Sequence, residues 1–350
     1  MKNIYYAVVI AIFLFSTLFA QSKNFKKETT PTIKESSSGV YGNAFSDFYF
    51  NVSHHDSTQK GNNAFQVRRI QFGYFNTFNS DVAVKLLLEG NNVALGGKMD
   101  VYLKQAFVEW KNISSHYLNI SIGKFYTPAE VNAEKFWNYR SLEKTMMERV
   151  GLVSTTDMGF SLFGKSDQQG TMSYTVMVAN GNGDLNEKDK NKKGYLSLNF
   201  VPMKGNLIEL YADFENYGNG KNKLNAKLLY GMSSDKMSLG VEAFYGMYKK
   251  TSASNVDETP LGASLFTWME VAKSMRVVVR GDYYDGDMKL KSSGTRDIYA
   301  IVGFDYMPVP EVHFIPNFVY MKYLNKVSGA AKVDDDMMVR LTAAFYLPTL

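Results

Sequence analysis

The residues that could perform enzyme chemistry are few in this chain. It has no cysteine, which excludes disulfides, thiolate metal sites and cysteine nucleophiles. A hydrolase would need a nucleophile beside a base, with a third group that orients the base. The histidines are His54, His55, His116 and His313, and none has a serine partner at a recognisable spacing. We therefore predict that the chain is not an enzyme and binds no cofactor.

Two polar stretches offer metal ligands without the full pattern of a metal site. The stretch 54–56 reads His-His-Asp, but adjacent residues of a strand point to opposite faces, so we interpret it as a loop. The stretch 181–184 reads Gly-Asn-Gly-Asp and precedes further oxygen-bearing side chains that suit Ca²⁺. It lacks the spacing of a calcium-binding loop, and turn formation explains the same residues. We predict no metal site.

The charged stretch between Tyr126 and Thr156 is better suited to ion selection than to catalysis or metal binding. A connection of about thirty residues in a compact domain is usually functional. Residues 129–137 could form a short helix inside it, and charged residues continue to Arg149. Rings of charge at a narrow point of a channel bias which ions pass; the alternative is a solvent-exposed loop of ordinary mixed charge. The candidates for pore constriction and selectivity are Arg69, Lys85, Glu130, Glu134, Arg140, Lys144, Arg149, Arg276, Arg280 and Arg340.

Much of the sequence consists of segments of about ten residues in which apolar and polar side chains alternate. These segments would form the strands that hold the charged residues in place. Clear examples are 70–75, 118–123, 158–162 and 339–345. A period of two places one set of residues on each face of a strand, and many such strands with one apolar face indicate a transmembrane β-barrel. Turn signals delimit about sixteen strands. The expected spans are 40–53, 64–78, 82–90, 99–111, 117–126, 157–165, 171–180, 194–202, 207–217, 223–232, 236–249, 261–272, 275–285, 296–307, 311–323 and 336–347.

The connections between these segments alternate in length. Outer-membrane barrels alternate long outer loops with short periplasmic turns, whereas a soluble β-sandwich has no reason to keep this rhythm. The connection at 218–222 is shorter than the rest of its series. The fold prediction is therefore all-β: a transmembrane antiparallel barrel of about 16 strands, with a long third loop that folds inward and both termini in the periplasm. The long connections are 54–63, 91–98, 127–156, 181–193, 250–260, 286–295 and 324–335.

The start of the chain predicts export. Residues 1–20 contain Lys2, an apolar run and the small residue Ala20, as in a cleaved secretory signal peptide. A single anchoring helix is the alternative, but the run is short for a span and lacks a flanking basic stop signal. Residues 21–38 predict a disordered lead-in, which leaves 39–350 for the barrel. The net charge of +5 is small, and nothing indicates a nucleic-acid partner.

Several motifs resemble those of a known family. Residues 65–73 read FQVRRIQFG and residues 123–128 read GKFYTP, followed by 147–149 (MER) and 157–159 (DMG). Over roughly 64–165 the chain thus resembles the sixteen-stranded outer-membrane porins and, among them, the phosphate-selective porin O and P family. The resemblance implies a trimeric channel for small hydrophilic solutes or anions. Such an analogy does not by itself establish what passes through the channel.

Alternation also predicts which charges face the lumen. They are mixed in sign, whereas a dedicated phosphate channel should show a ladder dominated by arginine and lysine. Arg68 and Lys124 fall on the lipid-facing parity, near the rim, where a basic residue costs little. One interpretation is that the lumen-facing charges only hydrate the wall and hold the loop in place through ion pairs. The alternative is a basic cluster at the constriction, formed by Arg69, Arg140, Lys144 and Arg149. The residues predicted to face the lumen are Arg69, Lys85, Lys227, Arg276, Arg280, Arg340, Glu89, Glu109, Glu209, Asp213, Glu242, Glu270, Asp282 and Asp305.

The sequence as a whole predicts a bacterial outer-membrane porin. Its partners would be outer-membrane lipid, the other subunits of a homotrimer, and small hydrophilic solutes or ions that diffuse passively, with anions such as phosphate as one option. The principal alternative is a plugged barrel whose loops bind a partner or adhere to a surface. An outer-membrane enzyme and a soluble, glycan-binding β-sandwich are the other two.

Overall fold

The computed structural model describes residues 37–91, 99–114, 118–167, 169–252, 255–290 and 293–347. The expected signal peptide, nearly all of the expected lead-in and most of the connection at 91–98 lie outside these ranges. Among the described residues, no helix is long and apolar enough to cross a bilayer.

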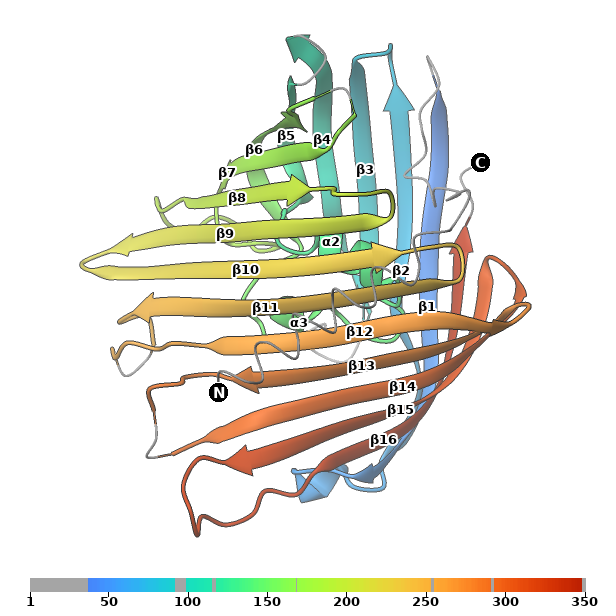
Figure 1. Ribbon diagram of the computed structural model, residues 1–350, viewed down its shortest axis with the longest axis vertical. Helices are drawn as coiled ribbons and strands as arrows, with labels where there is room; N and C mark the ends of the chain where they lie inside the picture. Colours follow the sequence, from blue (N-terminus) through green and yellow to red (C-terminus); the bar gives the residue numbers. More distant parts are fainter. Residues whose placement is uncertain are drawn as a thin grey trace.

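The described strands form one closed antiparallel barrel (Figure 1). Each strand pairs with its neighbours in sequence, and β1 pairs with β16 to close the sheet. This confirms the predicted fold class. The strands are β1 (Ser38–Ser53), β2 (Asn63–Thr77), β3 (Val82–Asn91), β4 (Asp100–Ser114), β5 (Leu118–Tyr126), β6 (Thr156–Lys165), β7 (Met172–Ala179), β8 (Lys193–Phe200), β9 (Asn206–Gly218), β10 (Lys221–Ser233), β11 (Met237–Lys249), β12 (Leu261–Ala272), β13 (Met275–Asp285), β14 (Thr295–Val309), β15 (Val312–Asn325) and β16 (Asp336–Leu347).

Alternation along each strand gives the barrel two different faces. On β14, Val302 and Phe304 are exposed on the outer face, whereas Ile301 and Asp305 point inward and are fully buried. A closed sheet with an apolar outer face leaves no strand edge unpaired, which is what a bilayer requires of a spanning sheet.

β2 and β4 each contain a β-bulge, which interrupts the alternation of inward-facing and outward-facing side chains along the strand. Arg68 has no register partner on β1, and Lys104 has none on β3. An extra residue in one strand lets two consecutive side chains point to the same face. Arg68 therefore points inward and pairs with Asp47, so its predicted position on the lipid face is wrong.

Lys124 also lies inside the barrel. The preceding Gly123 has φ +127°, and a Cβ there would lie 2.2 Å from the carbonyl oxygen of Ala106. Beyond this bend the Lys124 side chain is buried, and its Nζ lies 2.9 Å from a carboxylate oxygen of Asp184. The predicted lipid-facing position of Lys124 is therefore wrong as well.

The connection between β5 and β6, residues 127–155, folds into the barrel and is called loop L3 below. Its neck is closed because the Thr127 N–H donates to the Thr155 carbonyl at 2.8 Å and the Thr127 hydroxyl donates to the Ser154 carbonyl at 2.8 Å. L3 contains α2 (Val131–Trp137) and α3 (Met146–Arg149), and η1 (Ser57–Gln59) follows β1. Asn138 caps the C-terminus of α2, and its φ of +54° lies in the left-handed region that asparagine adopts more readily than most residues.

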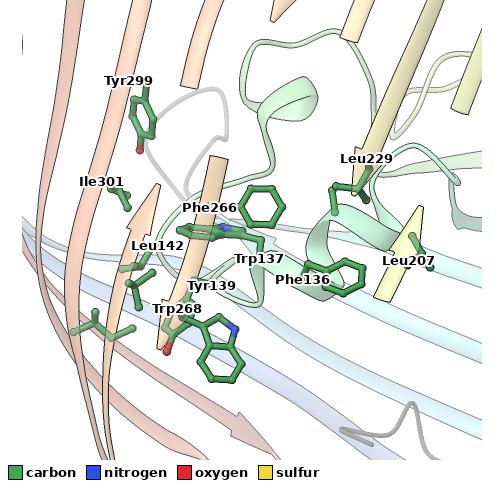
Figure 2. Close-up of a cluster of buried hydrophobic side chains, with 13 residues drawn as sticks. Phe136, Trp137, Tyr139, Leu142, Leu207, Leu229, Phe266, Trp268, Tyr299 and Ile301 are labelled. Carbon is green, nitrogen blue, oxygen red and sulfur yellow. The ribbon is translucent and has the colours of Figure 1, made fainter. Parts of the chain in front are cut away.

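L3 packs on the barrel wall through an apolar cluster, which we call the lumen core (Figure 2). Helix α2 contacts β10, β11 and β12, and α3 contacts β12. L3 thereby fills the lumen along one side of the barrel. The lumen core consists of Ala133, Phe136, Trp137, Tyr139 and Leu142 of L3 with Leu207, Leu229, Phe266, Trp268, Val278, Tyr299, Ile301 and Ile315 of the wall.

Candidate functional site: a constriction between two cavities

Two cavities lie between L3 and the part of the wall that the lumen core does not fill. One opens toward the long connections and has a volume of about 710 Å³; we call it the loop-side cavity. The other lies toward the tight turns, along β3 to β8, and has a volume of about 620 Å³; we call it the turn-side cavity. Thr155, at the neck of L3, lines both of them.

An ion pair lies where the two cavities meet. Glu134 of α2 lines the turn-side cavity and Arg140 lines the loop-side cavity, with Arg140 Nε 3.2 Å from Glu134 Oε1. Arg140 also pairs with Glu148 at 2.6 Å, and Lys144 lies 3.6 Å from the same Glu148 oxygen. L3 therefore places one guanidinium between two carboxylates at the boundary of the cavities.

The facing wall carries charges that are paired in the same way. Arg69 of β2 lies 2.7 Å from Glu89 of β3, and Glu89 also accepts a hydrogen bond from Tyr102 at 2.7 Å. Donors and acceptors therefore lie close together on both sides of the boundary between the cavities. Such an arrangement offers hydrogen bonds to polar solutes while most of the net charge is cancelled.

Other arginines of the wall hold the backbone of L3. Arg68 and Arg340 both donate to the Leu142 carbonyl, the latter at 2.8 Å, and Arg280 donates to the Lys144 carbonyl. Backbone carbonyls of an irregular loop need partners when they are buried, and a guanidinium can supply several donors. These side chains fix the position of L3, and Arg68 and Arg340 also line the loop-side cavity.

The predicted candidates thus divide into two groups. Seven of them line one of the two cavities: Arg69, Lys85, Glu130, Glu134, Arg140, Lys144 and Arg340. The remaining three lie inside the barrel but away from both cavities. Arg280 and Arg149 pair with Asp282 at 2.7 and 3.1 Å, and Arg276 stacks 4.2 Å from the centre of the Trp268 ring. Their role in selectivity stays a prediction.

Several cavity residues were not predicted. Arg68, Lys104, Tyr102 and Asp184 line the loop-side cavity. A signal for Arg68 and Lys104 exists in the sequence, because each is followed by a second polar residue inside a strand, which breaks the alternation as a bulge does. Asp184 comes from a distant connection, and nothing in the local sequence places it against β4 and β5.

A cluster of buried carboxylates surrounds one lysine behind L3. Lys227 of β10 lies 3.1 Å from Glu209 of β9, and it also donates to the Ala129 carbonyl of L3. Glu130 of L3 and Glu242 of β11 are buried close to the same ammonium. Burial raises the pKa of the Glu130 carboxyl well above its ordinary value, even though the Lys227 ammonium acts in the opposite direction.

We expect Arg140→Ala to shift the ion preference of the constriction toward cations. The change leaves Glu134 and Glu148 without their guanidinium. A unit charge about 8 Å from a passing ion in water contributes roughly 0.5 kcal/mol, or about a twofold change in local ion concentration. The reversal potential under a salt gradient measures this shift. Burial raises the pKa of Glu134 while Arg140 opposes the shift, so the gained cation preference should fade as the pH falls and this carboxyl takes up a proton.

Lys144→Ala is the matched control, because it removes the same charge from the rim, where the Lys144 side chain is 49% exposed. Its effect on the reversal potential should be smaller. An equal shift in both variants would contradict the placement of Arg140 between the two cavities.

Comparison with known proteins supports the fold. No family model and no curated protein matches the chain. Among solved structures, it is similar to the outer membrane channel DcaP of Acinetobacter baumannii, with a TM-score of 0.64, 11% identity, and 93% of this chain and 100% of that chain covered. It is similar to an anion-selective porin from Comamonas acidovorans (TM-score 0.63, 11% identity, coverage 89% and 100%). It is also similar to the trimer form of OmpT, an outer membrane protein of Vibrio cholerae (TM-score 0.62, 11% identity, coverage 89% and 100%). The chain therefore has the fold of the porin barrels.

Proposed function

We propose that this chain is a passive diffusion channel of the bacterial outer membrane for small hydrophilic solutes or ions. The observation that carries the proposal is the pair of cavities in series beside L3, inside a closed barrel whose outer face is apolar. Solutes would pass along β1 to β8, because the lumen core occupies the other side. Export through a cleaved signal peptide over residues 1–20 and assembly as a homotrimer complete the proposal; the similar Vibrio cholerae protein has a trimer form.

The charges at the constriction support weak rather than strong ion selectivity. Arg69, Lys104 and Arg140 each lie within 3.2 Å of a carboxylate oxygen. The anion-selective porin from Comamonas acidovorans has the same fold, but the paired charges here give less support to a preference for phosphate or other anions.

The second candidate is the plugged barrel that binds a partner through its long connections. The observation in its favour is the lumen core, which fills one side of the barrel with packed apolar side chains. In a plugged barrel, no continuous path for solutes would connect the two cavities.

Planar-bilayer recording on the refolded mature chain separates the two candidates. The channel proposal expects stepwise conductance, with a small reversal potential under a salt gradient because the charges are paired. Inserted protein that carries no current would support the plugged barrel instead. Block by low concentrations of phosphate would revive phosphate selectivity.

A further inference from the structure

The connection between β7 and β8, residues 180–192, contributes Asp184 and Leu185 to the lining of the loop-side cavity. Asp184 Oδ2 lies 2.7 Å from Lys104 Nζ, and Asp184 Oδ1 lies 2.9 Å from Lys124 Nζ. The Thr156 hydroxyl donates to Asp184 Oδ1 at 2.6 Å. The Asp184 carboxylate is thus held by three donors from three different strands.

These three donors belong to the wall, and the wall keeps them in place. Thr156 is fully buried, and the side chains of Lys104 and Lys124 are only 6% and 9% exposed. Lys124 also donates to the Leu103 carbonyl at 3.0 Å, and both ammonium groups lie within 6 Å of the centre of the Tyr102 ring, at 5.7 and 5.9 Å. Two buried ammonium groups and one hydroxyl are an arrangement that binds an oxyanion.

Asp184 itself comes from the connection between β7 and β8 and not from a strand of the wall. Its side chain is 29% exposed, and it faces the loop-side cavity that solutes would enter. Although burial acts the other way, the Lys104 ammonium and the other donors hold its pKa below the ordinary value, so it is ionised at neutral pH. The Glu89 and Glu134 carboxylates also interact with the Lys104 ammonium, so its charge is shared among several carboxylates, whereas the Lys124 ammonium pairs with Asp184.

We propose that Lys104, Lys124 and Thr156 form a binding site for the carboxylate of a small solute, and that Asp184 occupies this site when no solute is bound. The inference rests on the proposed channel function for the route of the solute. An incoming carboxylate takes the place of Asp184, and residues 181–185 then move away from the neck of L3. Gly183 fits this contact closely, since a Cβ there would lie 2.4 Å from Ser154 Oγ.

Competition from the Asp184 carboxylate would make such a site suitable for a channel. A tethered group competes at an effective concentration of about millimolar or more, so the solute is bound weakly and released easily. Conduction requires binding that is favourable enough to enter but weak enough to leave. The same contact would keep the loop-side cavity partly covered when no solute is present.

The test is calorimetric titration of the folded protein in detergent with succinate, which does not depend on current. Asp184→Ala removes the competitor and should bind succinate about tenfold more tightly than the unaltered chain, or more, with Asp184→Asn in between. Adding Lys104→Met to Asp184→Ala should abolish the gain. Asp189→Asn is the matched control from the same connection, where the carboxylate accepts a hydrogen bond from the Asn191 N–H, and its affinity should equal that of the unaltered chain.

Equal affinity in the unaltered chain and Asp184→Ala, or a gain that survives Lys104→Met, would overturn the inference. These outcomes are separable from failure of the channel proposal. A protein that shows the expected affinities but carries no current would retain the carboxylate site and lose the diffusion function. A protein that conducts but lacks the expected affinities would retain the diffusion function and lose the carboxylate site.

Discussion

Trp137→Ala should release L3 from the wall while the barrel stays closed. Trp137 is fully buried, packs edge-on against Phe266 with ring centres 5.8 Å apart, and donates from Nε1 to the Glu143 carbonyl at 2.8 Å. Truncating a buried tryptophan costs about 3–5 kcal/mol. The strand ladder does not use this side chain, so the loss falls on the packing of L3, and the opening equilibrium shifts by about a hundredfold or more.

Trypsin digestion of the folded barrel in detergent measures this release. L3 contains four basic residues, Lys135, Arg140, Lys144 and Arg149, and cleavage after them should be slow in the unaltered chain and fast in Trp137→Ala. In bilayers the same variant should show larger and noisier conductance. Trp110→Ala is the control, because Trp110 is 51% exposed on the outer face. Equal protection of L3 in all three proteins would contradict the role of the lumen core.

Lys227→Met should destabilise the anchor of L3 by a comparable amount. The change leaves Glu209, Glu130 and Glu242 buried without the ammonium that they share. Removing one partner of a buried ion pair typically costs about 3–5 kcal/mol, because the remaining charge has neither water nor a counter-ion. Loss of the contact with the Ala129 carbonyl would also free the start of α2.

Urea titration followed by tryptophan fluorescence measures the expected loss, since Trp137 and Trp268 both lie in the lumen core. The difference in unfolding free energy between the unaltered chain and Lys227→Met should become smaller as the pH falls. Glu130 has a raised pKa in the folded protein, so its burial is least costly when it is protonated, and stability declines as the pH rises through the interval above its ordinary value. Lys223→Met, on the same strand with its ammonium over Tyr217 and Tyr248, is the control. A deficit independent of pH, or equal in both variants, would contradict this account.

The strands and their inward faces could be predicted because a period of two is a local property of the sequence. The short helix predicted inside 129–137 is also present, as α2 at Val131–Trp137. The predictions for Arg68 and Lys124 failed where the period is interrupted. A bulge depends on the register between two strands, and the bend at Gly123 depends on the approach of β4; neither is written in one strand alone.

The candidate site could be predicted only in part for a related reason. Arg280 and Arg340 point into the barrel as the alternation predicts, yet their donors are taken by carbonyls of L3. Which charges line the two cavities depends on where L3 crosses the lumen. That position follows from the packing of Trp137, Phe136 and Leu142 on strands far away in the sequence, which no local pattern specifies.

Solutes are expected to pass between L3 and the wall formed by β1 to β8. Because the chain has no cysteine, single cysteines introduced for a charged thiol reagent would report on this path without background. Thr175 lines the turn-side cavity, whereas Ser264 is buried on the other side of the barrel, where it donates to Asp282 at 2.6 Å. In planar bilayers the reagent should reduce the stepwise current of Thr175→Cys and leave that of Ser264→Cys unchanged. Block of Ser264→Cys alone, or the absence of any current, would contradict the account.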